Sequence, residues 1–491
     1  MSEVQSTEQR DIRIKKLKEF ENLGINPYPH IYKPTDTSSG LNEKYKDLPN
    51  DTQKEDSVKV AGRIKAIRNS GMFIDLYDKD GKIQIFSSLE NLPKEQLDIL
   101  SLLDIGDIIG VEGHVKRTKR GELSVVTEKL TVLSKSLIPL PEKYHGLTDT
   151  EMKYRQRYVD MIVNDSTIQT FIKRSRIITS VRDTLLKKDF LEVETPILHP
   201  IKGGATARPF VTHHNTLDMD LYLRVAPELY LKRLIVGGLD AVFEIGRVFR
   251  NEGMDTRHNP EFTILEAYCK YKDYYDMMDL FEDIVRNACL AVNGTLQIEF
   301  DGKKIDFEKP FARRSMDSLV KEYTGIDFLT IHSDEEAVKA AESIGVKVEG
   351  DQVWGQALVS VFEAKCEENL IQPTHVMNHP LSNSPLTKTH REDSRLVERF
   401  ETYINGWEMC NAYTELTNPL DQRDRLKDQV RQAKAGNPEA DTMVDEDFVT
   451  ALEYGMAPTG GLGIGIDRLV MILTGNLSIR DVIAFPTLRL K

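Results

Sequence analysis

Cysteines are few and far apart in this chain, and long apolar runs are missing. The 491 residues contain four cysteines and no Cys-x-x-Cys pair, which excludes a disulfide framework and a paired-cysteine zinc site and is typical of a reducing compartment. No run of about 18 apolar residues occurs, so we expect no membrane span. The N-terminal residues also lack the apolar core of a secretory signal. We therefore expect a cytoplasmic protein.

Net positive charge is missing as well. The formal charge is -13, whereas a protein that binds nucleic acid mainly through phosphates is usually basic. The imbalance is uneven, because residues 1–150 hold 23 Lys+Arg against 24 Asp+Glu and the remainder carries -12. A polyanion would therefore meet the least repulsion at the N-terminal part. The length predicts roughly two to four domains.

Short β-branched segments dominate the N-terminal part. They are separated by Gly, Asp or Lys turns and occupy residues 58–69, 71–78, 81–86, 107–117 and 122–134. About five strands in about 80 residues predict a small closed barrel. We assign a helical extension to residues 1–50, the barrel to 51–136 and a Pro-containing linker to 137–150.

The pattern of the remainder, residues 151–491, predicts an α+β domain. A largely helical pattern precedes the segment LEVETPIL, which we interpret as a strand stopped by Pro196. Strands then alternate with the helix ELYLKRLIVGG. Residues 316–370 are mixed and largely helical. Strands return at 398–416, and a Gly-rich stretch precedes the final apolar helix, IDRLVMILTG.

One short hairpin, FRNEGMDTRHNPEFTILEAY, carries many charges of both signs. If both arms are extended, Arg250 and Glu252 share one face, and Phe262, Glu266 and Tyr268 share another. An arginine can bind phosphate in fork geometry, and an aromatic ring can stack on a base. The hairpin thus suits a nucleotide, while a solvated loop with a surface Arg250–Glu252 ion pair is the alternative.

This hairpin resembles motif 2 of the class II aminoacyl-tRNA synthetases. GLGIGIDR resembles motif 3, the helix and strand that end at Pro196 resemble motif 1, and LPEKYHGLTDTEMKYRQRYVDMI resembles the lysine-specific branch. The resemblance implies an OB-fold barrel that binds the tRNA anticodon, an antiparallel catalytic sheet and a homodimer formed through motif 1. It also implies ATP-dependent attachment of L-lysine to tRNA(Lys), with Mg²⁺ as cofactor.

The resemblance also assigns the nucleotide site. Arg250 and Arg468 are the implied catalytic residues, with Arg250 on the α-phosphate and Arg468 over adenine opposite Phe262. Glu252 would accept a hydrogen bond from the adenine amino group. The other implied ATP contacts are His258, Asn259, Glu408, Met409 and Gly465, and Glu401 with Glu408 would hold the metal. Because Glu401 and Glu408 are an odd number of residues apart, we expect a bulge at Gly406.

A pocket for lysine should bury carboxylates and have no cation of its own, because the ligand brings the positive charge. The resemblance places Glu228 and the Gly204 backbone at the α-ammonium, and Glu415 with Tyr268 at the ε-ammonium. The other implied lysine contacts are Glu266, Asn411 and Tyr413. A resident lysine or arginine that neutralised both Glu228 and Glu415 would argue against this assignment. Glu228, which follows Pro227, could equally stabilise a helix N-terminus.

On the barrel, the residues implied to contact the anticodon are Arg68, Phe73, Gln84 and Glu122. Phe73 would stack on a base, and the others would bond base edges. An aspartyl- or asparaginyl-type synthetase shares the barrel and motifs but would need cationic side-chain recognition, whereas the pocket candidates are acidic. A noncatalytic synthetase-like binding protein is the second alternative, and the intact Arg250, Glu252, Phe262 and Arg468 argue against it.

Overall fold

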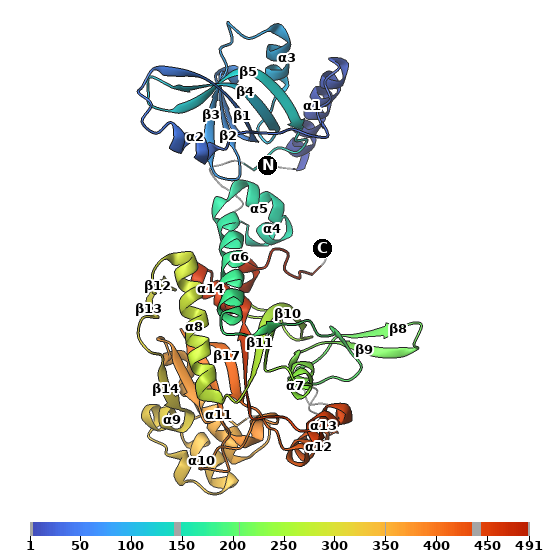
Figure 1. Ribbon diagram of the computed structural model, residues 1–491, viewed down its shortest axis with the longest axis vertical. Helices are drawn as coiled ribbons and strands as arrows, with labels where there is room; N and C mark the ends of the chain where they lie inside the picture. The colour runs from blue at the N-terminus through green and yellow to red at the C-terminus, as the bar shows by residue number, and fades with distance from the viewer. Residues whose placement is uncertain (1–2, 142–148, 206, 349, 435–442, 490–491) are drawn as a thin grey trace. The chain divides into compact units, whose positions relative to one another are not determined.

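The computed structural model describes residues 3–141, 149–205, 207–348, 350–434 and 443–489. The chain divides into two compact units, Met1–Thr150 and Glu151–Lys491 (Figure 1). The predicted α+β class is confirmed, with a barrel in the first unit and a large mixed sheet in the second. The centre of the predicted linker, 142–148, lies outside the described residues. Across the described ranges, no helix combines the length and apolarity needed to cross a bilayer.

The first unit is built on a closed five-stranded barrel, as predicted, and its strand order is β1-β2-β3-β5-β4. Its strands are β1 (Thr52–Arg68), β2 (Phe73–Tyr77), β3 (Lys82–Phe86), β4 (Ile108–Arg117) and β5 (Leu123–Ser134). A register shift between Ile64 and Ala66 bends β1, so that one strand can pair with both β2 and β4. Gly113 is required on β4, because a Cβ there would lie 1.8 Å from the Val126 carbonyl oxygen.

Three helices accompany the barrel: α1 (Glu3–Asn22), α2 (Ser38–Lys44) and α3 (Lys94–Leu102). The extension was predicted as helix, but α1 ends at Asn22, and α2 and α3 were not predicted. Phe20 of α1 is fully buried in the barrel core. Arg13 of α1 donates to the Ser136 carbonyl at 3.0 Å, so this helix holds the chain as it leaves β5.

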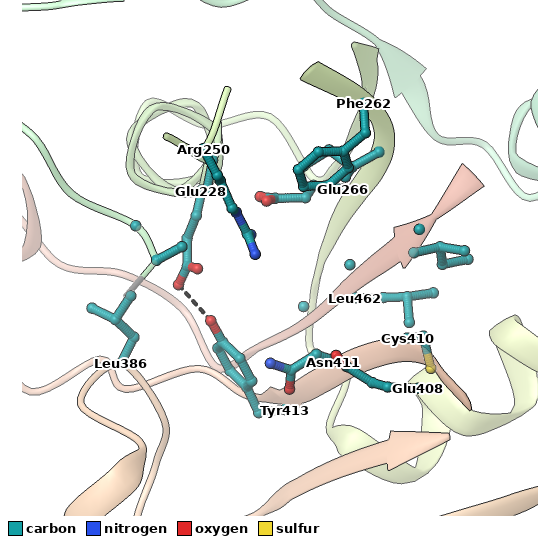
Figure 2. Close-up of a pocket in the computed structure, with 18 of the residues that line it drawn as sticks. Glu228, Arg250, Phe262, Glu266, Leu386, Glu408, Cys410, Asn411, Tyr413 and Leu462 are labelled. Atoms are coloured by element: carbon teal, nitrogen blue, oxygen red, sulfur yellow. Dashed lines mark hydrogen bonds between the residues drawn. The ribbon is translucent and has the colours of Figure 1, made fainter. Parts of the chain in front are cut away.

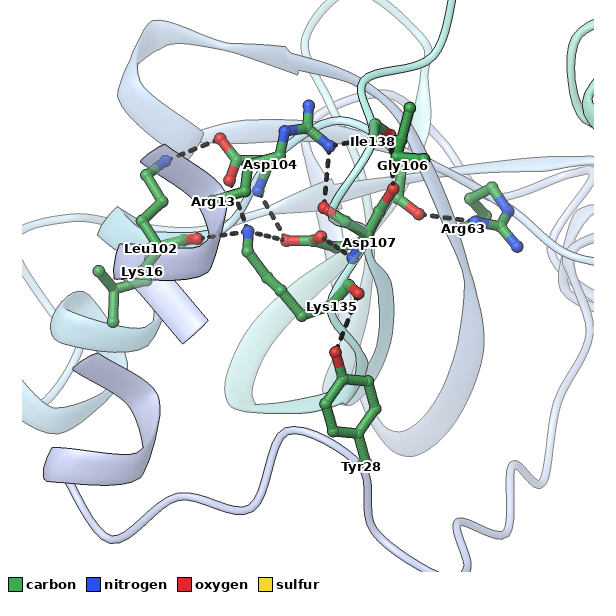
Figure 3. A network of polar contacts seen from close by, with 11 residues as sticks. Arg13, Lys16, Tyr28, Arg63, Leu102, Asp104, Gly106, Asp107, Lys135 and Ile138 are labelled. Carbon is green, nitrogen blue, oxygen red and sulfur yellow. Dashed lines mark hydrogen bonds and ion pairs between the residues drawn. The ribbon is translucent and has the colours of Figure 1, made fainter. Parts of the chain in front are cut away.

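A buried ion cluster closes this end of the barrel (Figure 3). Lys135 is fully buried and donates to the Leu102 carbonyl at 2.9 Å, to Asp104 at 2.5 Å and to Asp107 at 2.8 Å. Asp107 also accepts from the backbone N–H groups of Asp104 and Ser136, both at 2.8 Å. Each buried charge therefore has opposite charges and hydrogen bonds around it, which is the condition under which buried ions are tolerated.

The second unit is organised around an eight-stranded sheet with strand order β14-β15-β16-β17-β18-β11-β10-β6. The β14–β15 and β10–β6 pairs are parallel and the other neighbours are antiparallel. Its strands are β6 (Leu191–Glu192), β10 (Ala241–Phe249), β11 (Glu261–Lys270), β14 (Ala312–Ser315), β15 (Thr374–Met377), β16 (Arg399–Ile404), β17 (Trp407–Thr414) and β18 (Thr459–Gly465). Two smaller sheets contain β7 (Leu198–His199), β8 (Val211–His214) and β9 (Met219–Leu223), and β12 (Gln297–Phe300) and β13 (Lys303–Asp306).

Alternation along β11 gives the large sheet two different faces. Leu265 and Ala267 pack in a core with α6 (Asp165–Leu186), α8 (Tyr274–Asn293) and α14 (Ile466–Thr474), which lie together in Figure 1. Glu266 and Tyr268 point the other way and line a cavity. Successive residues of a strand face opposite sides of the sheet, so core residues alternate with cavity-lining residues along β11.

The remaining helices complete the unit. They are α4 (Thr150–Arg155), α5 (Arg157–Val163), α7 (Glu228–Val236), α9 (Met316–Thr324), α10 (Asp334–Ser343), α11 (Trp354–Lys365), α12 (Pro419–Lys434), α13 (Glu446–Glu453) and α15 (Ile479–Val482). α9, α10 and α11 share a core of their own. The strand predicted at LEVETPIL is only partly present. Two residues, β6, join the large sheet, and β7 after Pro196 joins a separate one, because proline cannot donate a ladder hydrogen bond.

Candidate active site

A cavity of about 440 Å³ lies on the face of the large sheet that carries Glu266 and Tyr268 (Figure 2). Most residues predicted for the nucleotide and lysine sites line this one cavity: Gly204, Glu228, Arg250, Glu252, His258, Asn259, Phe262, Glu266, Tyr268, Glu408, Met409, Asn411, Tyr413, Gly465 and Arg468. Glu401 and Glu415 lie outside its lining. Residues far apart in sequence therefore converge on a single site.

Arg250 is the principal cation of this cavity. It follows the end of β10 and points into the open space in Figure 2. Its buried Nε has no hydrogen-bond partner among the described residues, and its guanidinium lies 5.2 Å from the centre of the Phe262 ring. Burial lowers the pKa of Arg250, while Glu252 and other carboxylates oppose this shift. The described residues contain no Arg250–Glu252 ion pair, so this guanidinium is available to an anion.

The loop between β10 and β11 is folded by Asp255. One carboxylate oxygen accepts from the backbone N–H groups of Arg257 at 2.6 Å and His258 at 2.8 Å, and the other accepts from His258 Nδ1 at 2.8 Å. Arg468 Nη2 lies 3.1 Å from His258 Nε2. These partners assign the imidazole proton to Nδ1. Arg468 also donates to the Glu408 carbonyl at 2.7 Å, so the loop, β17 and α14 meet at the cavity.

Asn259 and Arg257 lie in the same loop. Asn259 donates to the Glu261 carbonyl at 2.6 Å, and its buried Oδ1 accepts no hydrogen bond from the described residues. Arg257 was not assigned a role from the sequence, yet it lines the cavity and its guanidinium lies 5.3 Å from the centre of the Trp407 ring. The loop thus presents a second arginine at the cavity that motif matching alone did not identify.

Three buried carboxylates lie near one another, and two of them, Glu228 and Glu266, line the cavity. Glu228 at the start of α7, Glu266 on β11 and Glu415 just after β17 are 4%, 7% and 0% exposed. The Tyr413 hydroxyl donates to Glu228 at 2.7 Å, and the Tyr268 hydroxyl donates to Glu266 at 3.0 Å. Burial and the nearby Glu228 raise the pKa of Glu266 to about 8. Burial likewise raises the pKa of Glu415 well above its usual value.

The prediction that this pocket has no cation of its own is wrong. Lys232, one helical turn after Glu228 on α7, is fully buried. Its Nζ lies 2.6 Å from Glu228 Oε1 and forms an ion pair with Glu415. Burial alone would lower the pKa of Lys232, but the two glutamates outweigh it and raise the pKa. One ammonium cannot pair fully with two carboxylates, however, and Glu266 is a third acidic group, so the pocket retains acidic side chains for a cationic ligand.

Glu415 lacks part of the environment that a buried carboxylate requires. Glu415 Oε2 contacts the Lys232 ammonium, while Oε1 has no hydrogen-bond partner among the described residues. Gly461 makes room for it, since a Cβ at that position would lie 1.9 Å from Glu415 Oε1. Gly461 was not predicted as a site residue. By contrast, a Cβ at Gly463 or Gly465 would meet only ordinary contacts with protein atoms.

Arg399 orients Asn411. Arg399 Nε donates to the Asn411 side-chain oxygen at 2.9 Å, which leaves the amide N–H₂ as the group that can donate to a ligand. Arg399 also donates to Glu401 at 2.5 Å. The sequence analysis did not assign Arg399, although its alternation with Glu401 along β16 was a usable signal.

The implied metal ligands, Glu401 and Glu408, lie on adjacent strands. The register shifts between Thr402, paired with Cys410, and Tyr403, paired with Glu408, so Met409 is the bulged residue and the bulge expected at Gly406 is wrong. Gly406 instead forms the hairpin turn with Asn405, where both residues have positive φ. The two carboxylates offer the hard oxygen donors that Mg²⁺ prefers. The described ranges contain no cluster of three or more His, Cys, Asp or Glu side chains suited to a metal.

The residues predicted to contact the anticodon lie on or beside neighbouring strands of the barrel. Their polar side chains already have partners within the barrel. Arg68 donates to both oxygens of Asp75 at 2.9 Å, Gln84 accepts from Ser124 at 2.9 Å, and Glu122 pairs with Lys82 at 2.6 Å. Phe73 lies opposite Phe86, with ring centres 5.3 Å apart. Phe86 was not predicted, although it alternates with Gln84 along β3. The face therefore offers two aromatic rings beside paired polar groups.

Both units match known protein families. Residues 149–489 match the family described as tRNA synthetases class II (D, K and N), and residues 58–133 match the OB-fold nucleic acid binding domain. The sheet and its cavity are therefore those of a class II tRNA synthetase.

Curated relatives specify the branch. The lysine–tRNA ligases of Sinorhizobium medicae (strain WSM419) and Rhizobium meliloti (strain 1021) are 53% and 52% identical to this chain, over 99% of its length and 98% of theirs. The lysine–tRNA ligase of Syntrophomonas wolfei is 50% identical, over 99% of this chain and 98% of the relative. The chain belongs to the lysine–tRNA ligase family.

The raised pKa of Glu266 makes a prediction about stability. The folded, ligand-free protein retains a proton on Glu266 up to about pH 8, whereas the unfolded chain loses it near pH 4.5. Stability should therefore fall as pH rises between these values, by at most roughly 1.4 kcal/mol per pH unit from this group. Glu266→Gln should remove this slope and gain stability relative to the parent as pH rises.

Denaturant unfolding of parent and variant at several pH values without ligand measures the difference. Glu252→Gln, at an exposed carboxylate of the same cavity, is the control and should run parallel to the parent. A constant difference between Glu266→Gln and the parent over this range would show that Glu266 is ionised when folded.

Proposed function

We propose that the chain attaches L-lysine to tRNA(Lys) through a lysyl-adenylate intermediate, at the cost of ATP. The observation that carries this proposal is that buried Glu228 and Glu266 line one cavity, while Lys232 pairs with both Glu228 and the neighbouring Glu415. The remaining negative charge suits an amino acid with two ammonium groups. An aspartyl- or asparaginyl-type substrate would place an acidic or neutral side chain against the same carboxylates.

Adenylate formation requires two anions to approach each other. The lysine carboxylate attacks the α-phosphorus of ATP, the bond to the bridging oxygen breaks, and pyrophosphate leaves. Arg250 would contact both the carboxylate and the α-phosphate, offsetting their repulsion and the charge that develops at phosphorus. The absence of a hydrogen-bond partner at its buried Nε supports this role. No side chain needs to act as a general base for this step, because the attacking carboxylate is already ionised.

The nucleotide end of the cavity suits adenine and phosphates. We infer that adenine lies between Phe262 and Arg468, with Glu252 accepting from its amino group, and that His258 and Asn259 face the phosphates. Met409 would contribute its backbone at the bulge. Gly463 and Gly465 are glycines although protein atoms leave room for a Cβ, which supports a close approach of the nucleotide to β18.

The amino acid end assigns one group to each part of lysine. Glu228 and the backbone of Gly204 would bind the α-ammonium, and Glu266 adds negative charge beside them. Glu415 and Tyr268 would bind the ε-ammonium, and Tyr413 would pack along the alkyl chain. Glu415 suits a cation, because its buried Oε1 has no hydrogen-bond partner among the described residues. Asn411, held by Arg399, presents its N–H₂ for the lysine carboxylate.

We infer that Glu401 and Glu408 hold Mg²⁺ together with the ATP phosphates. Two carboxylates with phosphate oxygens match the ligand set that Mg²⁺ adopts at nucleotide sites. When bound, the ion supplies positive charge to the phosphates. Arg399 and Tyr403 fix the Glu401 carboxylate at 2.5 and 2.7 Å.

The second step transfers lysine to tRNA. The 3′-hydroxyl of the terminal ribose attacks the carbonyl carbon of the adenylate, and AMP leaves with the bonding electron pair. We infer that the barrel reads the anticodon, with Phe73 stacking on a base and Arg68, Gln84 and Glu122 bonding base edges. The free thiols and the tRNA substrate agree with a cytoplasmic location.

We also infer that the chain forms a homodimer through the motif 1 region. The end of α6, β6, β7 and the β8–β9 hairpin expose large apolar side chains that are 43–63% accessible: Leu186, Leu191, Ile197, Leu198, Val211 and Leu217. Exposed apolar side chains gathered in one region mark protein interfaces.

Exchange of labelled pyrophosphate into ATP tests the reaction. L-Lysine should support the exchange, whereas aspartate and asparagine should not. Arg250→Ala should reduce it by about 100-fold or more, as expected when a cation that stabilises developing charge is removed. Arg247→Ala, three residues earlier on β10 with a partly exposed side chain, is the matched control. Exchange that depends on aspartate or asparagine would exclude lysine as the substrate.

Phe73→Ala tests the barrel. Loss of a stacking ring should raise the KM for tRNA roughly tenfold or more, while lysine-dependent pyrophosphate exchange stays near the parent level. Phe73→Leu keeps an apolar side chain against Phe86 and separates stacking from packing, so it should behave like Phe73→Ala in tRNA charging. Equal loss of exchange and charging would indicate that Phe73 serves stability.

Sedimentation equilibrium tests the dimer. The parent should have twice the mass of one chain, and Leu198→Asp or Val211→Asp should shift it toward the monomer, because a charge buried in an apolar interface is costly. Leu420→Asp on α12, also exposed, should leave the mass unchanged. A monomeric parent at micromolar concentration would contradict the proposal.

A further inference from the structure

Lys232 is a buried charge for which the proposed reaction has no role. It lies on α7 between Glu228 and Glu415, the carboxylates proposed for the α-ammonium and the ε-ammonium. The ring centres of Tyr413 and Phe448 lie 5.6 and 5.9 Å from its Nζ. An ammonium so placed is surrounded by groups that would also surround the substrate.

The barrel contains a buried lysine whose charge and hydrogen bonds are satisfied by the protein alone. Lys135 donates to three acceptors, and Asp107 accepts two backbone N–H groups in addition to its ion pair (Figure 3). At Lys232 the arrangement is incomplete, because Glu415 Oε1 has no hydrogen-bond partner among the described residues. The cluster around Lys135 is therefore satisfied by protein groups alone, whereas the cluster around Lys232 can still accept a hydrogen bond from another donor.

Charge balance indicates which donor is missing. Ionised Glu228, Glu266 and Glu415 carry three negative charges, and Lys232 offsets one. Lysine brings two ammonium groups, and its carboxylate is matched by Arg250. Each of these charges then has a partner, which is the condition for burying ions. Without Lys232, one carboxylate would have no cation and would take up a proton.

We propose that Lys232 is a specificity-determining residue, a permanent third ammonium that pairs with both Glu228 and Glu415 and leaves acidic groups for a diammonium amino acid. The inference rests on the proposed function. Lys232 acts through the glutamates and is therefore a positioning residue. The groups that face it are Glu228 from its own helix, Glu415 and Tyr413 from β17 and its end, and Glu266 and Tyr268 from β11.

Pyrophosphate exchange by the full chain, with L-lysine and with the neutral isostere L-6-hydroxynorleucine, tests the proposal. Lys232→Met should lower kcat/KM for lysine about tenfold or more near neutral pH, mainly through KM, because Glu415 becomes protonated. The KM for ATP should stay within about twofold of the parent value. The kcat/KM for the neutral analogue should fall less than that for lysine, so the ratio of the two, the lysine preference, should fall about tenfold. Higher pH should restore lysine use, and Lys232→Arg, which retains the charge, should rescue it in part.

Arg233→Met is the matched control. Arg233 is the next residue on α7 and pairs with Asp445 and Asp447, so its loss perturbs the same helix without changing the charge shared by Glu228 and Glu415. It should leave the lysine preference unchanged. If Lys232→Met does not fold, Lys232→Gln, which keeps polar contacts without charge, replaces it. The ratio of kcat/KM for lysine to kcat/KM for the neutral isostere is then measured in the same way.

Two outcomes separate this inference from the proposed function. A parent that shows no lysine-dependent exchange overturns the proposed function. Two results with a parent that activates lysine would overturn the role of Lys232 alone. In the first, the neutral Lys232 variant loses activity equally with lysine and with the neutral analogue. In the second, Arg233→Met loses the lysine preference to the same extent as the Lys232 variant.

Discussion

The catalytic unit depends on holding several carboxylates together where water is excluded. Glu228, Glu266 and Glu415 come from a helix start, a strand and a strand end, and burial disfavours the ionised form of each. The same desolvation that makes the empty pocket costly makes it attract cations, because charge interactions strengthen as the dielectric constant falls. Lys232 relieves part of this cost and leaves the rest for the substrate. Recognition and local instability therefore have one physical origin.

The sheet makes this arrangement compatible with a stable fold. Along β11, Leu265 and Ala267 pack against helices while Glu266 and Tyr268 face the cavity, so the strand contributes to the core and to the site at once. On the neighbouring strand, Gly461 makes room for Glu415. The apolar face stabilises the unit and allows the other face to carry charges that a free-standing helix pair could not hold in place.

Much of this organisation could be predicted from the sequence, and the misses have identifiable causes. Period-two patterns predicted the barrel strands and the strands of the site, but α2 and α3 are short helices whose patterns are weak. Gly406 with Asn405 fitted either a bulge or a tight turn, and only the register placed the bulge at Met409. Lys232 looked like an ordinary helix lysine. Its spacing of four from Glu228 was a signal, whereas its contact with Glu415 is tertiary and no local pattern encodes it.

Charges of both signs in the cavity would also set the direction in which an amino acid binds. Arg250, Glu228 and Glu266 line the cavity together with Asn411 on β17. A substrate carboxylate would be drawn to the arginine and ammonium groups to the glutamates, so the reacting carboxylate would be directed toward the nucleotide before any chemistry occurs. An acidic side chain would meet Glu415 with like charge, and a neutral side chain would leave Glu415 Oε1 without a donor. Both are disfavoured by the cost of burying an unpaired charge, so the pocket selects by electrostatics where size alone would discriminate weakly.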